Sequence, residues 1–327
     1  MEIPPIKSKK ILLSPLNWGL GHVARTIPII QSLLEKKNEI IVFCNSQQKQ
    51  FYIQYFPDIK YIQHPDYPFK FKGEGKWVKD TLFQFFPLYK YLKKERKIVD
   101  KWIKYLKPDL IISDQRFGFY SSKVRSIIIS HQLNLPVSKW TFLVKWWNSK
   151  LLLKFDEIWV PDNKNRALSG SLSQGKHQNI HFIGIASRFQ GYSEKKPPIK
   201  YENLGIVSGP EPYNQQFLTL LIEKLSNSAV KSAIIYPSHL FISKDRVKNI
   251  DFFSSILPQE FEKVIYESDT IISRAGYSTL MDLKTLDKKA ILIPTPGQAE
   301  QEYLSNLHQG NSKWIFVNEK TFKDLEI

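Results

Sequence analysis

A glycine-rich turn near the start of the chain holds the first residues that could do chemistry. The stretch NWGLGH, residues 17–22, follows an apolar run that ends near Ser14 and precedes apolar residues at helical spacing. Gly19 and Gly21 allow a ligand to approach the backbone, and a helix start offers N–H groups and a positive dipole end. The same glycines also suit a purely structural tight turn. His22 favours a site, because it would project beyond the strand ends as a general base.

The spacing Gly19-x-Gly21-x-x-Ala24 also fits the loose fingerprint of a dinucleotide site. A nicotinamide site needs an acidic residue at the end of the second strand, about 20 residues further on, to bind the ribose. Here the second expected strand ends in FCNS, residues 43–46, and contains no acid. The sequence therefore disfavours NAD, and we expect no cofactor.

The second half of the chain contains two strand–turn–helix segments, TIISRAGYSTLMDL and ILIPTPGQAEQEYLSNL. Each has a glycine in its turn, and together they present hydroxyl, amide and carboxylate groups suited to a ribose and to sugar hydroxyls. Their candidate residues are Arg274, Ala275, Gly276, Ser278, Thr279, Asp282, Gln298, Gln301 and Glu302. A third turn, Ser208-Gly209, precedes a helix that starts with prolines. Alone, each segment would be an ordinary helix start, but their order favours a binding site.

Short β-rich runs alternate with longer helical runs along almost the whole chain, which predicts parallel sheets flanked by helices. We expect strands at 9–15, 39–45, 60–64, 109–114, 126–130, 157–161 and 180–184, and then at 203–209, 232–238, 270–276, 289–295 and 313–318. The polar stretch 185–202 contains Pro197 and Pro198 and separates the two series. The predicted fold is α/β, with two facing doubly wound Rossmann-like domains, an acceptor-side domain over 1–186 and a donor domain over 187–327, and a ligand cleft between them.

On the segments SRAG, GQAEQEY, FIGIASR and NWGLGH, the chain resembles glycosyltransferase family 28. The resemblance covers the chain in outline and is most specific at SRAG and GQAEQEY. It implies a GT-B fold and a UDP-sugar donor, UDP-N-acetylglucosamine or a related hexose. It also implies a lipid-linked or membrane-proximal acceptor.

The resemblance also implies roles for single residues. Arg188 is similar to the arginine that meets the donor diphosphate, and the turn 208–209 is similar to a loop near the phosphates. Asp282 stands where the family has a Glu that holds the ribose. Gln301 and Glu302 stand where the family has two glutamines that contact the transferred sugar. Glu302 is a departure, since an ionised carboxylate accepts hydrogen bonds but donates none.

These residues predict an inverting glycosyltransferase in which His22 or a nearby carboxylate removes the acceptor proton. Asp114 and His131 each end a strand, where they either line the acceptor side or cap the strand. We expect no metal, because the sequence has no DxD-like dyad and no His/Cys cluster at ligand spacing. Two alternatives are a nucleotide-sugar epimerase or hydrolase on the same fold, and a non-catalytic subunit that binds sugar nucleotides.

The net charge of +16 would suit an anionic partner, but Lys, Ile and Asn are abundant throughout, as in proteins from AT-rich genomes. The sequence has no helix-turn-helix, zinc or aromatic RNA-binding signature, so we expect no nucleic-acid partner. We expect a cytoplasmic protein, because the sequence shows neither a signal peptide nor a spanning segment. The single cysteine, Cys44, is expected to be buried.

Two stretches interleave basic and aromatic residues, 67–107 and 138–155. In the second, an expected helix has an aromatic face and cationic edges, which suits the headgroup layer of an anionic membrane; an ordinary core helix is the alternative. Its aromatic face comprises Trp140, Phe142, Leu143, Trp146 and Trp147, and its edges comprise Lys139, Lys145, Lys150 and Lys154. We therefore expect peripheral association with the inner face of the cell membrane.

Overall fold

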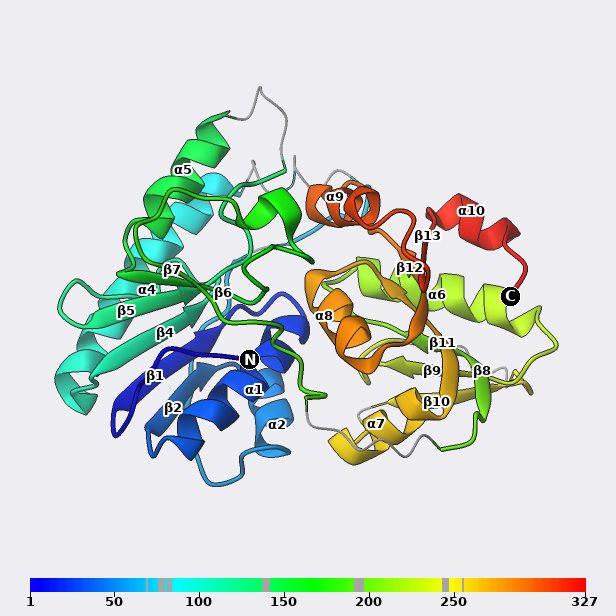
Figure 1. The fold of residues 1–327 in the computed structure, drawn as a ribbon, viewed down its shortest axis with the longest axis horizontal. Helices are drawn as coiled ribbons and strands as arrows, with labels where there is room; N and C mark the ends of the chain where they lie inside the picture. The colour runs from blue at the N-terminus through cyan, green and yellow to red at the C-terminus, as the bar shows by residue number, and fades with distance from the viewer. Residues whose placement is uncertain are drawn as a thin grey trace. The chain divides into compact units, whose positions relative to one another are not determined.

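The computed structural model describes residues 1–68, 70–75, 80, 84–136, 142–190, 197–242, 247–254 and 256–327. The chain forms two compact units (Figure 1). The first unit comprises Met1–Phe69 and Thr81–Arg188, and the second comprises Lys70–Asp80 and Phe189–Ile327. A short segment from the first half of the sequence therefore belongs to the second unit.

The first unit is built on a seven-stranded parallel sheet with the order β3-β2-β1-β4-β5-β6-β7. Its strands are β1 Lys10–Pro15, β2 Glu39–Cys44, β3 Lys60–Gln63, β4 Leu110–Asp114, β5 Arg125–Ile129, β6 Glu157–Val160 and β7 Ile180–Phe182. The order reverses between β1 and β4, where Pro15 pairs with Asp114. Open α/β sheets bind ligands beyond the strand ends at such a switch point.

Helices cover both faces of this sheet, which explains why β1, β2 and β4 are buried over nearly their whole length. The helices are α1 Gly21–Glu35, α2 Ser46–Ile53, α4 Phe85–Leu106, α5 Phe142–Leu152 and the short 3₁₀ helix η2 Gly170–Ser173. Figure 1 shows α1 and α2 on one side of the sheet and α4 on the other. Val99 and Ile103 of α4 pack on Leu12 and Ile41 of the sheet.

The second unit has a six-stranded parallel sheet with the order β10-β9-β8-β11-β12-β13, which reverses between β8 and β11. Its strands are β8 Tyr201–Ile206, β9 Ser232–Tyr236, β10 Ile250–Ser254, β11 Ser268–Arg274, β12 Lys289–Ile293 and β13 Trp314–Phe316. Its helices are α6 Tyr213–Ser226, α7 Pro258–Tyr266, α8 Tyr277–Leu286, α9 Ala299–Leu307 and α10 Glu319–Asp324. Strand β10, at the sheet edge, was not predicted.

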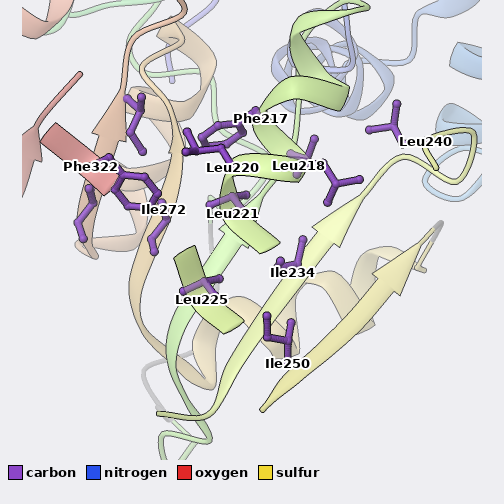
Figure 2. Close-up of a cluster of buried hydrophobic side chains, with 13 residues drawn as sticks. Phe217, Leu218, Leu220, Leu221, Leu225, Ile234, Leu240, Ile250, Ile272 and Phe322 are labelled. Atoms are coloured by element: carbon purple, nitrogen blue, oxygen red, sulfur yellow. The ribbon is translucent and has the colours of Figure 1, made fainter. Parts of the chain in front are cut away.

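Apolar side chains of α6 form the core of the second unit (Figure 2). Phe217 and Leu221 are fully buried against Ile234 of β9 and Ile272 of β11. Phe322 of α10 packs into the same cluster. The core thus fixes the sheet, α6 and α10 together.

The prediction of an α/β fold with two doubly wound units is confirmed. The cleft between the units and the boundary between residues 186 and 187 stay predictions. Among the helices of the described ranges, none is long and apolar enough to cross a membrane.

Candidate functional site

The predicted glycine turn joins β1 to α1 at the switch point of the first sheet. Gly19 has a positive φ of 78°, a backbone conformation that favours glycine. Helix α1 begins at Gly21, so His22 lies in its first turn. The expected strand, turn and helix are all present, and they place His22 beside the end of β4.

His22 and Asp114, which are 92 residues apart in the sequence, lie in contact. The Nδ1 atom of His22 is 3.0 Å from Oδ2 of Asp114, the last residue of β4. The Asp114 side chain is fully buried, whereas that of His22 is 18% exposed. All the hydrogen bonds of His22 to described side chains use Nδ1, so Nε2 is the ring atom that can exchange a proton with a ligand.

Arg25 is a central residue of this site that the sequence analysis missed. Its Nε donates a hydrogen bond to Asp114 Oδ2 at 2.9 Å, and its second terminal nitrogen pairs with Oδ1, which completes a two-pronged contact. Arg25 is 2% exposed. The available signal was its position one turn after His22, on a helix whose neighbouring residues Val23 and Ile27 are apolar and buried.

His131, which follows β5, completes the group that we call the switch-point cluster: His22, Arg25, Asp114 and His131. The Nδ1 atom of His131 is 3.3 Å from a terminal nitrogen of Arg25, and the His131 side chain is buried. The structure therefore brings three of the predicted first-unit residues, His22, Asp114 and His131, together through an arginine that contacts each of them.

The electrostatics of the switch-point cluster favour a neutral histidine beside an ionised carboxylate. Burial lowers the pKa of His22, and the charge of Arg25 lowers it further. Burial alone would raise the pKa of Asp114, but the charge of Arg25 and the hydrogen bonds from His22 and Arg25 outweigh burial and lower this pKa below its ordinary value. A neutral imidazole next to an aspartate is able to accept a proton.

A second group with a similar composition lies elsewhere in the same unit, and we call it the sealed triad: His64, Glu95 and Arg116. His64 Nε2 is 2.9 Å from Glu95 Oε1, and Arg116 Nε donates to the same oxygen at 2.7 Å. Arg116 also donates to the carbonyl of Pro65 and the hydroxyl of Tyr91. All three side chains of the triad are buried, so it ties α4 to the ends of β3 and β4.

In the second unit, the predicted turns follow β8, β11 and β12, three neighbouring strands. Gly209 has a φ of 99°, and a methyl group added there would meet open space. Gly276 is the N-cap of α8, and Ser278, Thr279 and Asp282 are half-buried on the following turns. Ser278 and Asp282 share a helix face because they are four residues apart.

Arg274 ends β11 and Ala275 follows it, and both residues are buried. A terminal nitrogen of Arg274 lies 2.7 Å from Glu319 Oε1, and another donates to the carbonyl of Pro294 at 3.3 Å. The guanidinium carbon also lies 4.3 Å from the ring centroid of Phe217. Arg274 therefore joins the ends of β11 and β12 to α6 and α10.

The turn before α9 is organised by its own side chains. Gln301 Oε1 accepts a hydrogen bond from the backbone N–H of Thr295 at 2.8 Å, and its amide donates to Gln298 Oε1 at 2.6 Å. Glu302 Oε1 accepts from the backbone N–H of Gly297 at 3.0 Å, while the side chain stays exposed. The three predicted sugar-binding residues thus lie on one ordered turn.

Residues 70–75, which we call the strap, pack on this same unit. The N–H of Gly75 donates to the hydroxyl of Tyr213 at 3.2 Å, and Gln216 donates to the carbonyl of Gly73 at 3.2 Å. A methyl group built on Gly297 would lie 1.9 Å from the Gly75 carbonyl oxygen. The strap therefore requires glycine at position 297, and the sequence analysis missed this contact.

Arg188, predicted to meet the donor diphosphate, is the last residue of the first unit. Its guanidinium carbon lies 5.5 Å from the centroid of the Phe51 ring. Within the described ranges, no group of three or more His, Cys, Asp or Glu side chains is arranged to hold a metal ion.

Two doubly wound units, with turns suited to ligand binding at both switch points, are the architecture of GT-B glycosyltransferases. Residues 240–320, which lie in the second unit, match the glycosyltransferase family 28 C-terminal domain. No match was found among curated protein sequences.

Solved structures with the same fold include the glycotransferase of kitacinnamycin, with 12% identity, coverage of 97% of this chain and 87% of that chain, and a TM-score of 0.66. UGT89C1 of Arabidopsis thaliana, solved with UDP-L-rhamnose, has 11% identity, coverage of 98% and 89%, and a TM-score of 0.64. MurG of Acinetobacter baumannii has 14% identity, coverage of 96% and 87%, and a TM-score of 0.54. At these identities the similarity establishes the fold.

Proposed function

We propose that the protein is an inverting glycosyltransferase that moves a hexose from a UDP-sugar to an acceptor hydroxyl, with His22 as the general base. The contact between His22 Nδ1 and Asp114 Oδ2 carries this proposal. When Nδ1–H donates to Asp114, the lone pair of Nε2 can take the acceptor proton. The acceptor oxygen then bonds to the anomeric carbon as the bond to UDP breaks on the opposite face, and UDP leaves with the electron pair.

The second unit supplies the groups that would bind the donor. The starts of α8 and α9 offer backbone N–H groups and positive dipole ends, and the turn 208–209 adds another close backbone approach. Asp282 would accept hydrogen bonds from the ribose, and Ser278 and Thr279 lie beside it. Structures of this fold bind nucleotide sugars or nucleoside diphosphates: UGT89C1 was solved with UDP-L-rhamnose and the spinosyn rhamnosyltransferase SpnG with thymidine diphosphate.

The transferred sugar would meet the turn before α9. Gln298, Gln301 and Glu302 are held there by hydrogen bonds to one another or to the turn backbone. N-acetylglucosamine or a related hexose presents hydroxyls that both amides and a carboxylate can bind. Helix-start N–H groups and Arg188 would stabilise the charge on the departing diphosphate, and we therefore propose that transfer is independent of a metal.

The proposed acceptor is lipid-linked or membrane-proximal, because α5 presents apolar residues to solvent among lysines. Phe142, Leu143 and Trp146 are 64%, 63% and 58% exposed, and Lys150 Nζ lies 5.8 Å from the Trp146 ring centroid. Trp147 does not share this surface, since it packs inward on the cluster that contains Leu88 of α4. Trp140 and Lys139 lie outside the described residues.

This surface suits an anionic bilayer on the inner face of the cell membrane, since apolar side chains enter the headgroup layer while lysines meet lipid charge. Co-sedimentation with phosphatidylglycerol vesicles should be salt-sensitive and should be lost in Phe142→Ala/Trp146→Ala. Phe241→Ala is a matched control, because Phe241 is 77% exposed in the second unit. Equal binding of both variants, or none by the wild type, would contradict membrane docking.

The proposed function is tested in two steps. A thermal-shift panel of UDP-, GDP- and dTDP-sugars identifies the donor, and UDP release is then measured with and without a lipid extract of cell membranes. We expect UDP-sugars to stabilise the protein and lipid to be required for rapid release. Conversion of the donor without lipid would indicate an epimerase or hydrolase instead, and binding without conversion would indicate a non-catalytic subunit.

A further inference from the structure

Arg25 contacts all three other members of the switch-point cluster. Its Nε and one terminal nitrogen hold the two oxygens of Asp114. The same terminal nitrogen lies 2.9 Å from His22 Nδ1, and the other lies 3.3 Å from His131 Nδ1. Such a buried arginine is positioned to control both the charge and the orientation of the base.

Two groups compete for Nδ1 of His22. Asp114 Oδ2 is 3.0 Å away and would accept a hydrogen bond from Nδ1–H, whereas Arg25 is 2.9 Å away and would donate to an unprotonated Nδ1. One nitrogen cannot do both. Only the first arrangement leaves a lone pair on Nε2 in the neutral ring, so the balance between Asp114 and Arg25 decides whether His22 can be a base.

We propose that Arg25 is a positioning residue: its charge keeps the His22 imidazole neutral, and its two-pronged contact fixes Asp114 as the acceptor for Nδ1–H. This inference rests on the proposed function, in which Nε2 takes the acceptor proton. Because Asp114 already satisfies two donors of Arg25, its ionised carboxylate remains in place to receive the third hydrogen bond, from His22.

The charges that face His22 explain why Arg25 is needed. Asp114 raises the pKa of His22, while burial, Arg25 and His131 lower it, and the net direction is downward. Without Arg25, a buried carboxylate would face the imidazole alone and favour an imidazolium–aspartate pair. A protonated His22 cannot accept a proton, so transfer at weakly acidic pH would be lost.

The test is a ¹⁵N-histidine NMR titration, which reports the protonation and tautomer of His22 without any substrate. Spectra of His22→Gln assign the resonances among the seven histidines of the chain. In the wild type we expect the His22 pKa to lie below the ordinary 6.5 and the neutral ring to carry its proton on Nδ1. In Arg25→Met we expect this pKa to rise by about one unit or more, and in Arg25→Lys by less.

Arg96→Met is the control, because it removes the same charge from α4 at a residue that bonds Tyr120 and Ser122 rather than the switch-point cluster. The inference is overturned if wild-type His22 titrates above its ordinary pKa, if its neutral form carries the proton on Nε2, or if Arg25→Met leaves the titration unchanged. If Arg25→Met does not fold, the pKa and the tautomer of His22 in the wild type still test the inference. Absence of sugar transfer would contradict the proposed function but not these titration results.

The kinetic counterpart is the acidic limb of the pH profile of transfer. Arg25→Met should move this limb to higher pH by about one unit, which lowers the rate about tenfold on the limb. A residue with only a structural role would lower the rate at all pH values without moving the limb. An unmoved limb in a folded variant would therefore contradict the inference.

Discussion

The first unit contains two clusters that each combine histidine, a carboxylate and arginine, and we propose chemistry for only one of them, the switch-point cluster. In both, burial lowers the pKa of the histidine, and an arginine outweighs burial to lower the pKa of the carboxylate. The side chain of His22 is 18% exposed, whereas that of His64 is 1% exposed. Composition and pKa direction therefore do not distinguish a reactive site from a structural one.

Position in the fold makes the distinction. Asp114 ends β4 at the switch point, where open sheets bind ligands. Glu95 lies within α4 instead, and its arginine partner also bonds Pro65 and Tyr91. The sealed triad thus joins elements of the fold, while the switch-point cluster keeps one histidine accessible.

The largest difference between the two clusters is expected in the transfer rate when the histidine of each cluster is replaced by alanine. His22→Ala should lower transfer at saturating donor by about 10²- to 10⁴-fold, the usual contribution of a general base, with donor binding retained. His64→Ala should destabilise the fold but leave the rate per folded molecule nearly unchanged. Equal rate losses in both variants, measured as UDP release with a lipid extract, would remove the distinction between the clusters.

Loss of the carboxylate charge should destabilise both clusters. Asp114→Asn and Glu95→Gln each leave a buried arginine without its ionic partner, and each should lower the free energy of unfolding by about 3 to 5 kcal/mol. Urea unfolding at neutral pH measures this loss. Of the two variants, only Asp114→Asn should also shift the pH profile of transfer; a shift in Glu95→Gln would show that the sealed triad is coupled to the chemistry.

Mild acid should destabilise the folded protein through both histidines. Below pH 6.5 the unfolded chain binds protons on His22 and His64 that the folded chain does not, because both folded pKa values are lowered. The free energy of unfolding should therefore fall by up to about 1.4 kcal/mol per pH unit for each histidine. Urea unfolding at about pH 7.5 and pH 5.5 should show a smaller drop in His64→Phe than in the wild type.

The smallest effect is expected at Glu302, an exposed carboxylate of the second unit with no arginine among its described contacts. Glu302→Gln keeps an oxygen for the N–H of Gly297 and adds a donor, so it should alter donor choice rather than stability. We expect the ratio of kcat/KM for UDP-N-acetylglucosamine over UDP-galactose to change by about three- to tenfold. Glu300→Gln on the same helix should leave this ratio unchanged.

The sequence predicted the sheets well because most of their strands contain a short run of apolar residues and are followed by a turn. Strand β10 was missed because its sequence, IDFFS, carries an acid and lies at a sheet edge, where burial is incomplete. Asp114 and His131 were recognised as strand-end residues. Their association was not predicted, since it depends on β1 lying beside β4 and on a buried arginine that makes contacts 89 and 106 residues away.

The strap was also beyond sequence reasoning, for a different reason. Phe71 and its basic neighbours belong to the first of the two stretches that interleave basic and aromatic residues, but Phe71 is 9% exposed and packs near Tyr213. Nothing in the local pattern indicates which unit a short aromatic segment will join. The strap can pack on the second unit because Gly297, which is far away in the sequence, has no side chain that would clash with the carbonyl oxygen of Gly75.

The strap makes the second unit discontinuous in the sequence, which matters for the design of hybrids between this protein and its relatives. A hybrid made by exchanging residues 189–327 for those of a relative would keep the strap of this protein, which packs on residues of its own second unit. Its Gly73 and Gly75 backbone groups would meet foreign residues at positions 213, 216 and 297. Under the proposed function, donor specificity can therefore be exchanged between relatives only if residues 70–80 are exchanged together with residues 189–327.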